Sequence, residues 1–203
     1  MKIFCIGRNY AAHAKELNND IPDEPLVFCK PHSAVLKNGK PFFHPDFSNN
    51  VHHEVELVLR ICRNGKHIEE RFAHKYYDRI TVGLDLTARD IQDRLKAKGH
   101  PWEIAKGFDG SAPLGDFISL DEIDDVNNIE FSLVRNGEIA QQGNTKDLLF
   151  NFDKLISYIS KYFILHQGDY IFTGTPKGVS KLNIGDRLEA FIGDKKLLQT
   201  KVL

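Results

Sequence analysis

Residues 129–142 read IEFSLVRNGEIAQQ, in which two β-prone runs flank the dipeptide Asn136-Gly137. An Asn-Gly pair in this setting favours a β-hairpin, because both residues tolerate the positive φ angles of a type I′ turn. The stretch therefore predicts a hairpin with strands at 129–134 and 138–142.

Short strands separated by turn residues dominate the rest of the chain. Residues 54–59 read EVELVL, an alternation that predicts a strand, and Arg63-Asn64-Gly65-Lys66 after it reads as a hairpin turn. Thr87 is placed to cap a helix that ends before Gly99. Further strands are expected at 2–6, 26–30, 80–86, 169–173, 188–192 and 196–202, with helices at 10–18, 87–98 and 152–163. The predicted fold class is α+β and β-rich.

Composition limits the classes of function. The 203 residues, 41% hydrophobic and 27% charged, predict one folded domain spanning residues 1–203, and a single catalytic domain is the working assumption. A net charge of −1 shows no excess of positive charge, which binding to nucleic acid would favour. Three cysteines cannot form a full disulfide framework, and no apolar run approaches the roughly 20 residues that cross a bilayer. We therefore expect a cytoplasmic protein without nucleic-acid or membrane partners.

Three acidic residues are candidate metal ligands. Glu54 and Glu56 stand two residues apart on a predicted strand, so their side chains point to the same face. Asp85 lies in an apolar context, where an unpaired charge is costly. Carboxylates suit Mg²⁺, which prefers oxygen ligands and keeps positions open for water or substrate. The alternative is that the glutamates lie on the solvated face of a half-buried strand.

Polar residues that could contact a substrate follow the acidic ones. Arg89 and Gln92 share one face of the predicted helix and could bind a carboxylate or carbonyl oxygen. Lys106 lies among apolar residues, where its ammonium could stabilise developing negative charge. Each is also compatible with an ordinary solvated surface.

Two further clusters contain residues that could take part in catalysis or in anion binding. His13 and Glu16 are three residues apart on a predicted helix, so the carboxylate can orient an imidazole that takes a proton from water. The loop 173–178 reads TGTPKG, and its glycines allow backbone amides to approach an anion. The loop lacks the P-loop spacing, so it does not predict nucleotide binding. A surface ion pair is the alternative for the first cluster.

Taken together, these motifs resemble the fumarylacetoacetate hydrolase family, in its short single-domain branch. The resemblance implies a mixed β-roll, a homodimer, and a divalent cation, Mg²⁺ with Mn²⁺ or Ca²⁺ as alternatives. The motifs that carry it, in chain order, are GRNYAAH at 7–13, HEVE at 53–56, DLTARDIQ at 85–92, AKGFD at 105–109 and TGTPKG at 173–178.

The resemblance also assigns roles to residues. It implies that residues 8–20 form a mobile lid carrying a catalytic dyad, that three acidic side chains bind the metal, and that polar residues surround a bound 2-oxo acid. In this sequence the dyad is His13 and Glu16, the metal ligands are Glu54, Glu56 and Asp85, and the substrate residues are Arg89, Gln92, Lys106 and Thr175. Thr175 matches the position that contacts the substrate's carboxylate end, and Lys106 also serves as a catalytic residue.

The functional hypothesis is a metal-dependent hydrolase or decarboxylase. It would cleave the C3–C4 bond of an acylpyruvate or oxaloacetate through a metal-bound pyruvate enolate. Because proton movement alone uses the same electron sink, a 2-hydroxyhepta-2,4-diene-1,7-dioate isomerase or an oxaloacetate tautomerase is the alternative. A non-catalytic protein that binds a metal or ligand on the same scaffold is a third hypothesis from a different class.

Overall fold

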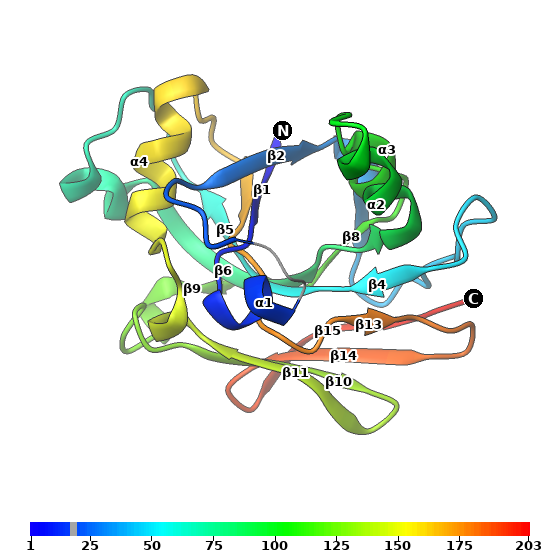
Figure 1. The fold of residues 1–203 in the computed structure, drawn as a ribbon. Coiled ribbons are helices and arrows are strands. Elements are labelled where there is room, and N and C mark those ends of the chain that lie inside the picture. The colour runs from blue at the N-terminus through cyan, green and yellow to red at the C-terminus, as the bar shows by residue number, and fades with distance from the viewer. Residues whose placement is uncertain (17–19) are drawn as a thin grey trace.

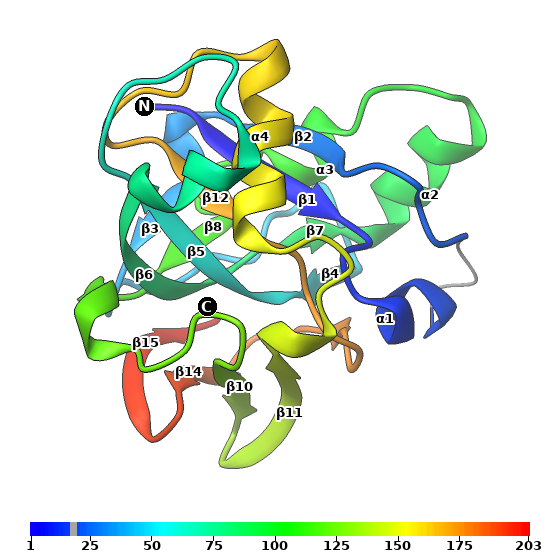
Figure 2. The same ribbon diagram turned by 90° about the vertical axis from the view of Figure 1, so that its left-hand side faces the viewer.

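The computed structural model describes residues 1–16 and 20–203, which fold into sheets arranged in layers (Figures 1 and 2). A large curled sheet lies above a smaller four-stranded sheet, and helices cover the outer sides. This is the β-rich α+β fold predicted from the sequence, a mixed β-roll.

The large sheet has eight strands and carries the functional site. Its order is β2-β1-β12-β5-β6-β8-β3, and β9 pairs with β6 off this path. Most neighbours are antiparallel, but β1 pairs parallel to β12 and β3 parallel to β8, so the sheet is mixed. The strands are β1 Ile3–Gly7, β2 Leu26–Lys30, β3 Val35–Lys37, β5 Val55–Ile61, β6 Tyr77–Leu84, β8 Ala112–Leu114, β9 Ile118–Ser119 and β12 Tyr170–Phe172.

The four-stranded sheet contains the hairpin predicted at residues 129–142. Asn136 and Gly137 both have positive φ, 54° and 90°, as a two-residue hairpin turn requires. The order is β11-β10-β14-β15, formed by β10 Glu130–Arg135, β11 Glu138–Asn144, β14 Arg187–Ile192 and β15 Lys195–Lys201. A third sheet joins β13 Ser180–Lys181, β4 Val51–His53 and β7 Thr87–Ala88.

Helices are short and few in the described residues. The sequence correctly predicted the amphipathic helix near 152–163, whose N-cap Asn151 accepts a hydrogen bond from Lys154 N at 2.9 Å. The helices are α1 Ala11–Glu16, α2 Arg89–Ala97, α3 Glu103–Lys106 and α4 Phe152–Tyr162, and the 3₁₀ turns are η1 His32–Ala34, η2 Glu70–Lys75, η3 Leu120–Glu122 and η4 Thr145–Asp147. None of the helices in residues 1–16 and 20–203 has the length and apolarity to span a bilayer.

Two local predictions were wrong. Thr87 does not cap α2: the N-cap is Ala88, and Thr87 Oγ1 instead donates to Asp85 O, because residue 87 belongs to a short strand. Residues 63–66 do not form a tight hairpin turn either. The connection from β5 to β6 includes η2, and Gly65 forms a bridge with Leu165.

The prediction that residues 8–20 form a mobile lid stays a prediction. The structure describes α1 within this segment, but residues 17–19 lie outside the described part of the chain, as does the end of the helix predicted at 10–18. The assignment of residues 1–203 to a single domain likewise remains an expectation from the sequence.

The main core lies between the two large layers. Side chains at alternate positions of β5, Val55, Leu57 and Leu59, are fully buried there and pack with Phe131 and Leu133 of β10. The other face of β5 is buried as well, with Val58 packed against Ile3 and Cys5 of β1, which the sequence did not indicate. That second buried face holds the functional site.

Candidate metal centre and active site

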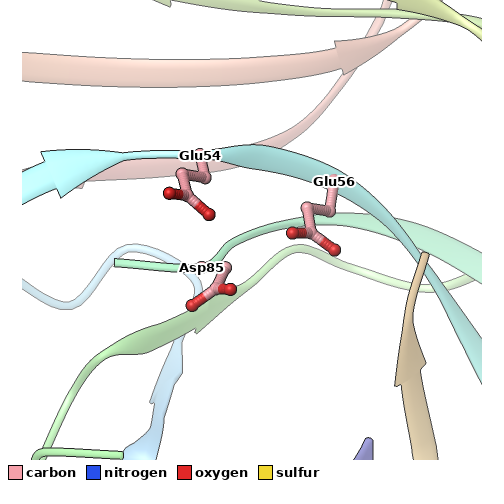
Figure 3. Close-up of side chains that lie close together, drawn as sticks. All are labelled: Glu54, Glu56 and Asp85. Atoms are coloured by element: carbon pink, nitrogen blue, oxygen red, sulfur yellow. The ribbon is translucent and has the colours of Figure 1, made fainter. Parts of the chain in front are cut away.

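Three carboxylates converge at one buried position (Figure 3). Glu54 precedes β5, Glu56 lies on it, and Asp85 follows directly after β6. The antiparallel register pairs Val55 with Leu84, so Asp85 N donates to Glu54 O at 2.8 Å. One oxygen from each carboxylate lies within 4.8 Å of the others. The juxtaposition predicted from the sequence is therefore present.

The chemistry of this cluster fits a divalent cation. The three residues are at most 5% exposed, and burial together with the charges of Asp85 and Glu54 raises the pKa of Glu56 well above its usual value. Asp85 Oδ1 accepts no hydrogen bond, although Lys30 Nζ lies 2.8 Å away as an ion pair. Three buried carboxylates held close together offer the oxygen ligands that a hard cation prefers.

Lys106 bridges two of the three carboxylates. Its ammonium donates to Glu54 Oε2 at 2.9 Å and to Asp85 Oδ2 at 2.7 Å, and it lies 5.1 Å from the centre of the Phe28 ring. Burial lowers the pKa of Lys106, but Asp85 and Glu54 outweigh burial and raise it. The side chain is therefore a cation at neutral pH, placed beside two of the carboxylates.

Arg89 and Gln92 also reach the site. Arg89 Nη2 donates to Glu54 Oε1, and Nη1 donates to Gln92 Oε1 at 2.6 Å. Burial raises the pKa of Glu54, yet the charges of Lys106 and Arg89 lower it well below its usual value. The face shared by Arg89 and Gln92 is therefore turned toward the carboxylates and not toward solvent.

Lys30 is a buried cation that the sequence did not reveal as part of the site. It is 2% exposed, at the end of β2, and its ammonium donates to the backbone oxygens of Lys106 and Ser111. It also pairs with Asp85 through Oδ1, whereas Lys106 pairs with Oδ2. Lys30 thus supports both Asp85 and the chain around Lys106. The only signal in the sequence was a charged residue ending an apolar strand.

His13 and Glu16 form the predicted pair on α1. His13 Nδ1 lies 3.4 Å from Glu16 Oε2, and the imidazole is 5% exposed in the same pocket as the carboxylates. Burial lowers the pKa of His13, an effect that the nearby Glu54 and Glu16 oppose. A lowered pKa keeps the imidazole neutral at pH 7, the state in which it can accept a proton.

The loop 173–178 holds carboxylates of the chain itself. Gly174 N donates to Glu56 Oε2 at 2.7 Å, and Gly178 N donates to Glu16 Oε1 at 2.9 Å. Gly174 has φ of 105°, and a Cβ there would lie 2.6 Å from Asn9 Cβ, so a side chain does not fit. The glycines do let amides approach anions, as predicted from the sequence.

Gln141 connects this loop to the metal-ligand strand. Its amide nitrogen donates to Thr175 Oγ1 at 2.9 Å, and its oxygen accepts from Val55 N at 3.0 Å and contacts His53 Nδ1 at 2.8 Å. Thr175 lines the pocket, as its predicted role requires. Gln141 was missed because its partners lie 34 to 88 residues away in the sequence.

The predicted residues thus come together from across the chain. All except Glu16 line one pocket, and Glu16 lies behind His13. The pocket-lining residues among them are His13, Glu54, Glu56, Asp85, Arg89, Gln92, Lys106 and Thr175. The pocket thus combines three buried carboxylates that could hold a divalent cation with flanking cations and a histidine that can accept a proton, an arrangement typical of an enzyme active site.

Comparison with known proteins identifies the family. The family model described as fumarylacetoacetate (FAA) hydrolase C-terminal matches residues 2–203, and the chain belongs to this family. It is 45% identical over 191 residues to oxaloacetate tautomerase FAHD1, mitochondrial, of Arabidopsis thaliana, covering 94% of this chain and 86% of the relative. It is 44% identical over 192 residues to oxaloacetate decarboxylase, mitochondrial, of Dictyostelium discoideum, covering 94% and 88%.

A solved structure agrees with these relatives. The fumarylpyruvate hydrolase of Pseudomonas aeruginosa, crystallised with Mn²⁺ and pyruvate, superposes with a TM-score of 0.94 at 37% identity, over 100% of this chain and 89% of that chain. The relatives are enzymes, and this chain is an enzyme of the same family. The resemblance found in the sequence is confirmed.

Proposed function

We propose that this enzyme acts on a small 2-oxo acid, with oxaloacetate as the first candidate, and uses a divalent cation held by Glu54, Glu56 and Asp85. The observation that carries the proposal is the group of three buried carboxylates, within 4.8 Å of one another, in one pocket with His13 and Lys106. The relatives named as an oxaloacetate tautomerase and an oxaloacetate decarboxylase support this substrate.

Carboxylate ligands favour Mg²⁺ or Mn²⁺ over softer metals. When bound, the cation would supply Lewis-acid stabilisation of the negative charge that develops on the oxo oxygen of the substrate. The Mn²⁺ in the fumarylpyruvate hydrolase structure supports a divalent cation in this family. We propose Mg²⁺ as the first candidate, as predicted from the sequence.

The chain supplies the proton chemistry. Neutral His13 can take the proton from the carbon next to the oxo group, and Glu16 orients its ring through Nδ1. Return of that proton to oxygen completes tautomerisation. In decarboxylation the C3–C4 bond breaks, CO₂ leaves, its bonding electron pair stays on the enolate, and a proton from water is delivered to C3. Lys106 and Arg89 hold anionic oxygens near the reacting atoms in either case.

Hydrolysis of an acylpyruvate is a second candidate. The observation that favours it is the His13–Glu16 pair, because a neutral histidine backed by a carboxylate can take a proton from water. Water would then attack the C4 carbonyl, and Lys106 would offset charge on the resulting oxyanion. The diene-dioate isomerase predicted as an alternative needs proton transfer alone and uses the same residues.

We also propose a homodimer and a cytoplasmic location. Support for the dimer is the exposed apolar surface of Phe47 and Ile104, 55% and 60% exposed, which border a groove of about 840 Å³ together with Phe108 and Pro31. A second copy of the chain is the proposed occupant, and light scattering after gel filtration, with Ile104→Asp as the disrupting variant, tests it. The location rests on the sequence expectation alone.

Turnover of the purified enzyme tests the reaction. Oxaloacetate, acetylpyruvate and a hydroxyhepta-diene-dioate are each assayed with Mg²⁺, with and without EDTA, and the enol form, CO₂, pyruvate and the diene are followed separately. Metal-dependent loss of the oxaloacetate enol or release of CO₂ is the expected result. Pyruvate from acetylpyruvate would favour the hydrolase, diene loss the isomerase. No metal-dependent turnover of the three would contradict the proposal.

A further inference from the structure

Two cationic side chains of the pocket take no part in the site described above. Arg8 follows β1 and Lys96 lies in the last turn of α2, and both line the pocket that contains Glu54. The other two cations of the pocket, Arg89 and Lys106, are bound to carboxylates. Within residues 1–16 and 20–203, Arg8 and Lys96 form no ion pair.

Lys96 is directed into the pocket by its position on α2. It lies four residues after Gln92 and seven after Arg89, so the three side chains share one helix face. Its ammonium lies 5.5 Å from the centre of the Trp102 ring, which also lines the pocket. The residue is half-buried, so Lys96 does not behave as a fully solvated surface lysine.

Arg8 is fixed by an unusual backbone conformation. Its φ is 59°, in the left-handed region that residues other than glycine rarely adopt. The next residue, Asn9, anchors this turn: its side chain donates to Thr173 O at 2.8 Å and accepts from Phe150 N at 2.8 Å. The turn therefore places Arg8 at the pocket that Lys96 also lines.

The cations of this region repel one another. Burial, Arg89 and Arg8 all lower the pKa of Lys96, and Asp93 and Glu54 only partly oppose them. Holding Arg8 and Lys96 near Arg89, without ion-pair partners of their own, costs free energy that a bound anion would offset. The cluster is thus built for a negatively charged group at the pocket's outer part.

We propose that Arg8 and Lys96 bind the second carboxylate of a dicarboxylic 2-oxo acid, and so give the enzyme a preference for dianionic over monoanionic substrates. The inference rests on the proposed function, because it places the 2-oxo end of the same molecule beside Glu54, Glu56 and Asp85. Arg8 and Lys96 are specificity-determining residues in this assignment, and the proton chemistry remains with His13.

A matched pair of ligands isolates the second carboxylate. 2-Oxoglutarate and 2-oxopentanoate have the same five-carbon chain and differ in one carboxylate. Binding of each in the presence of Mg²⁺ is measured by titration calorimetry with the wild type, Lys96→Gln, Lys96→Arg and Arg8→Gln. Lys98→Gln is the control, because Lys98 is exposed beyond the same helix and does not line the pocket.

The wild type is expected to bind 2-oxoglutarate more tightly than 2-oxopentanoate. Lys96→Gln and Arg8→Gln should each weaken 2-oxoglutarate binding by about tenfold, since a charged hydrogen bond is lost at a half-buried site, and change 2-oxopentanoate binding by less than about twofold. Lys96→Arg should keep most of the preference, and Lys98→Gln all of it. Thermal melts confirm that the variants fold.

Three results would overturn the assignment: no preference in the wild type, equal weakening of both ligands by the Gln variants, or no weakening of either. Oxaloacetate turnover by the wild type, measured in parallel, separates the two proposals. If the wild type turns over oxaloacetate but Lys96→Gln and Arg8→Gln keep the preference for 2-oxoglutarate, only the specificity assignment is contradicted. If the two variants lose that preference but the wild type turns over none of the tested 2-oxo acids, only the proposed reaction is contradicted.

Discussion

The two faces of β5 are both largely buried, but they carry different chemistry beside the site. On one face Val55, Leu57 and Leu59 pack into the apolar core, and their burial stabilises the fold. On the other face Glu56, with Glu54 just before the strand, is buried among charged groups. Burial of the apolar face carries no desolvation penalty for charged groups. Burial of the carboxylates on the acidic face lowers the free energy of unfolding unless cations lie beside them. Because successive side chains of a strand point to opposite faces, one strand can carry core residues on one face and functional residues on the other.

The largest expected effect is on the acidic face. Glu56→Gln should lower metal-dependent turnover at least about a thousandfold, because one of three oxygen ligands loses its charge. The same variant should be more stable than the wild type in EDTA at pH 7. The folded pKa of Glu56 lies above its usual 4.5, so ionisation of this group above that pH opposes folding. Steady-state kinetics and urea unfolding measure the two effects.

Unchanged turnover in Glu56→Gln would show that this residue is not a required ligand. A less stable variant in EDTA would show that the like charges of the site are already compensated in the metal-free protein.

The apolar face should respond in the opposite way. Leu57 is 0% exposed, and Leu57→Ala should lower the free energy of unfolding by about 4 kcal/mol, through lost burial and the cavity left behind. Turnover of the folded variant at low temperature should stay within about twofold of the wild type, since the side chain points away from the pocket. Urea unfolding measures the stability and steady-state kinetics measure the turnover. A loss of turnover in fully folded protein would show that the two faces are coupled.

A substitution of Lys30 tests whether buried cations offset the free-energy cost of burying the acidic side chains. Lys30→Met should lower the free energy of unfolding in EDTA by about 3 kcal/mol, because Asp85 and backbone carbonyls lose their buried cation. Saturating Mg²⁺ should recover part of this loss by restoring positive charge beside Asp85. Lys37→Met, an exposed lysine on β3, is the control. Equal losses with and without Mg²⁺ would argue against electrostatic compensation.

The smallest expected effect is the acid sensitivity of His53, beside the acidic face. Burial lowers the pKa of His53 below 6.5, although its hydrogen bond with Gln141 opposes the shift. Above pH 6.5 the imidazole is neutral in both states and contributes nothing. Below it, the unfolded chain binds an extra proton, so the free energy of unfolding falls by up to about 1.4 kcal/mol per pH unit.

His53→Gln should therefore flatten the pH dependence of stability between pH 6.5 and 5, measured by urea unfolding in EDTA. The exposed His100 gives the control variant, His100→Gln, which should leave the slope unchanged. An unaltered slope in His53→Gln would assign the acid sensitivity to other groups.

Local sequence predicted the elements better than the contacts between them. The hairpin at Asn136-Gly137 and the helix capped by Asn151 follow from residues a few positions apart. Lys96 could have been found in the same way, because it continues the face of Arg89 and Gln92. Lys30 could not, because its partners are 55 to 81 residues away and nothing local distinguishes it from a surface lysine.

The sequence alone determined the Asn136-Gly137 turn, the two-residue alternation of β5 and the chemical type of the site residues, since these depend on neighbouring residues and their intrinsic preferences. Only the tertiary structure decided that both faces of β5 are buried, that the β5–β6 register brings Asp85 to Glu54, and that Gly174 donates to Glu56. The physical reason is that burial and long-range hydrogen bonds depend on which strands pair and in which register, and many registers satisfy the same local pattern.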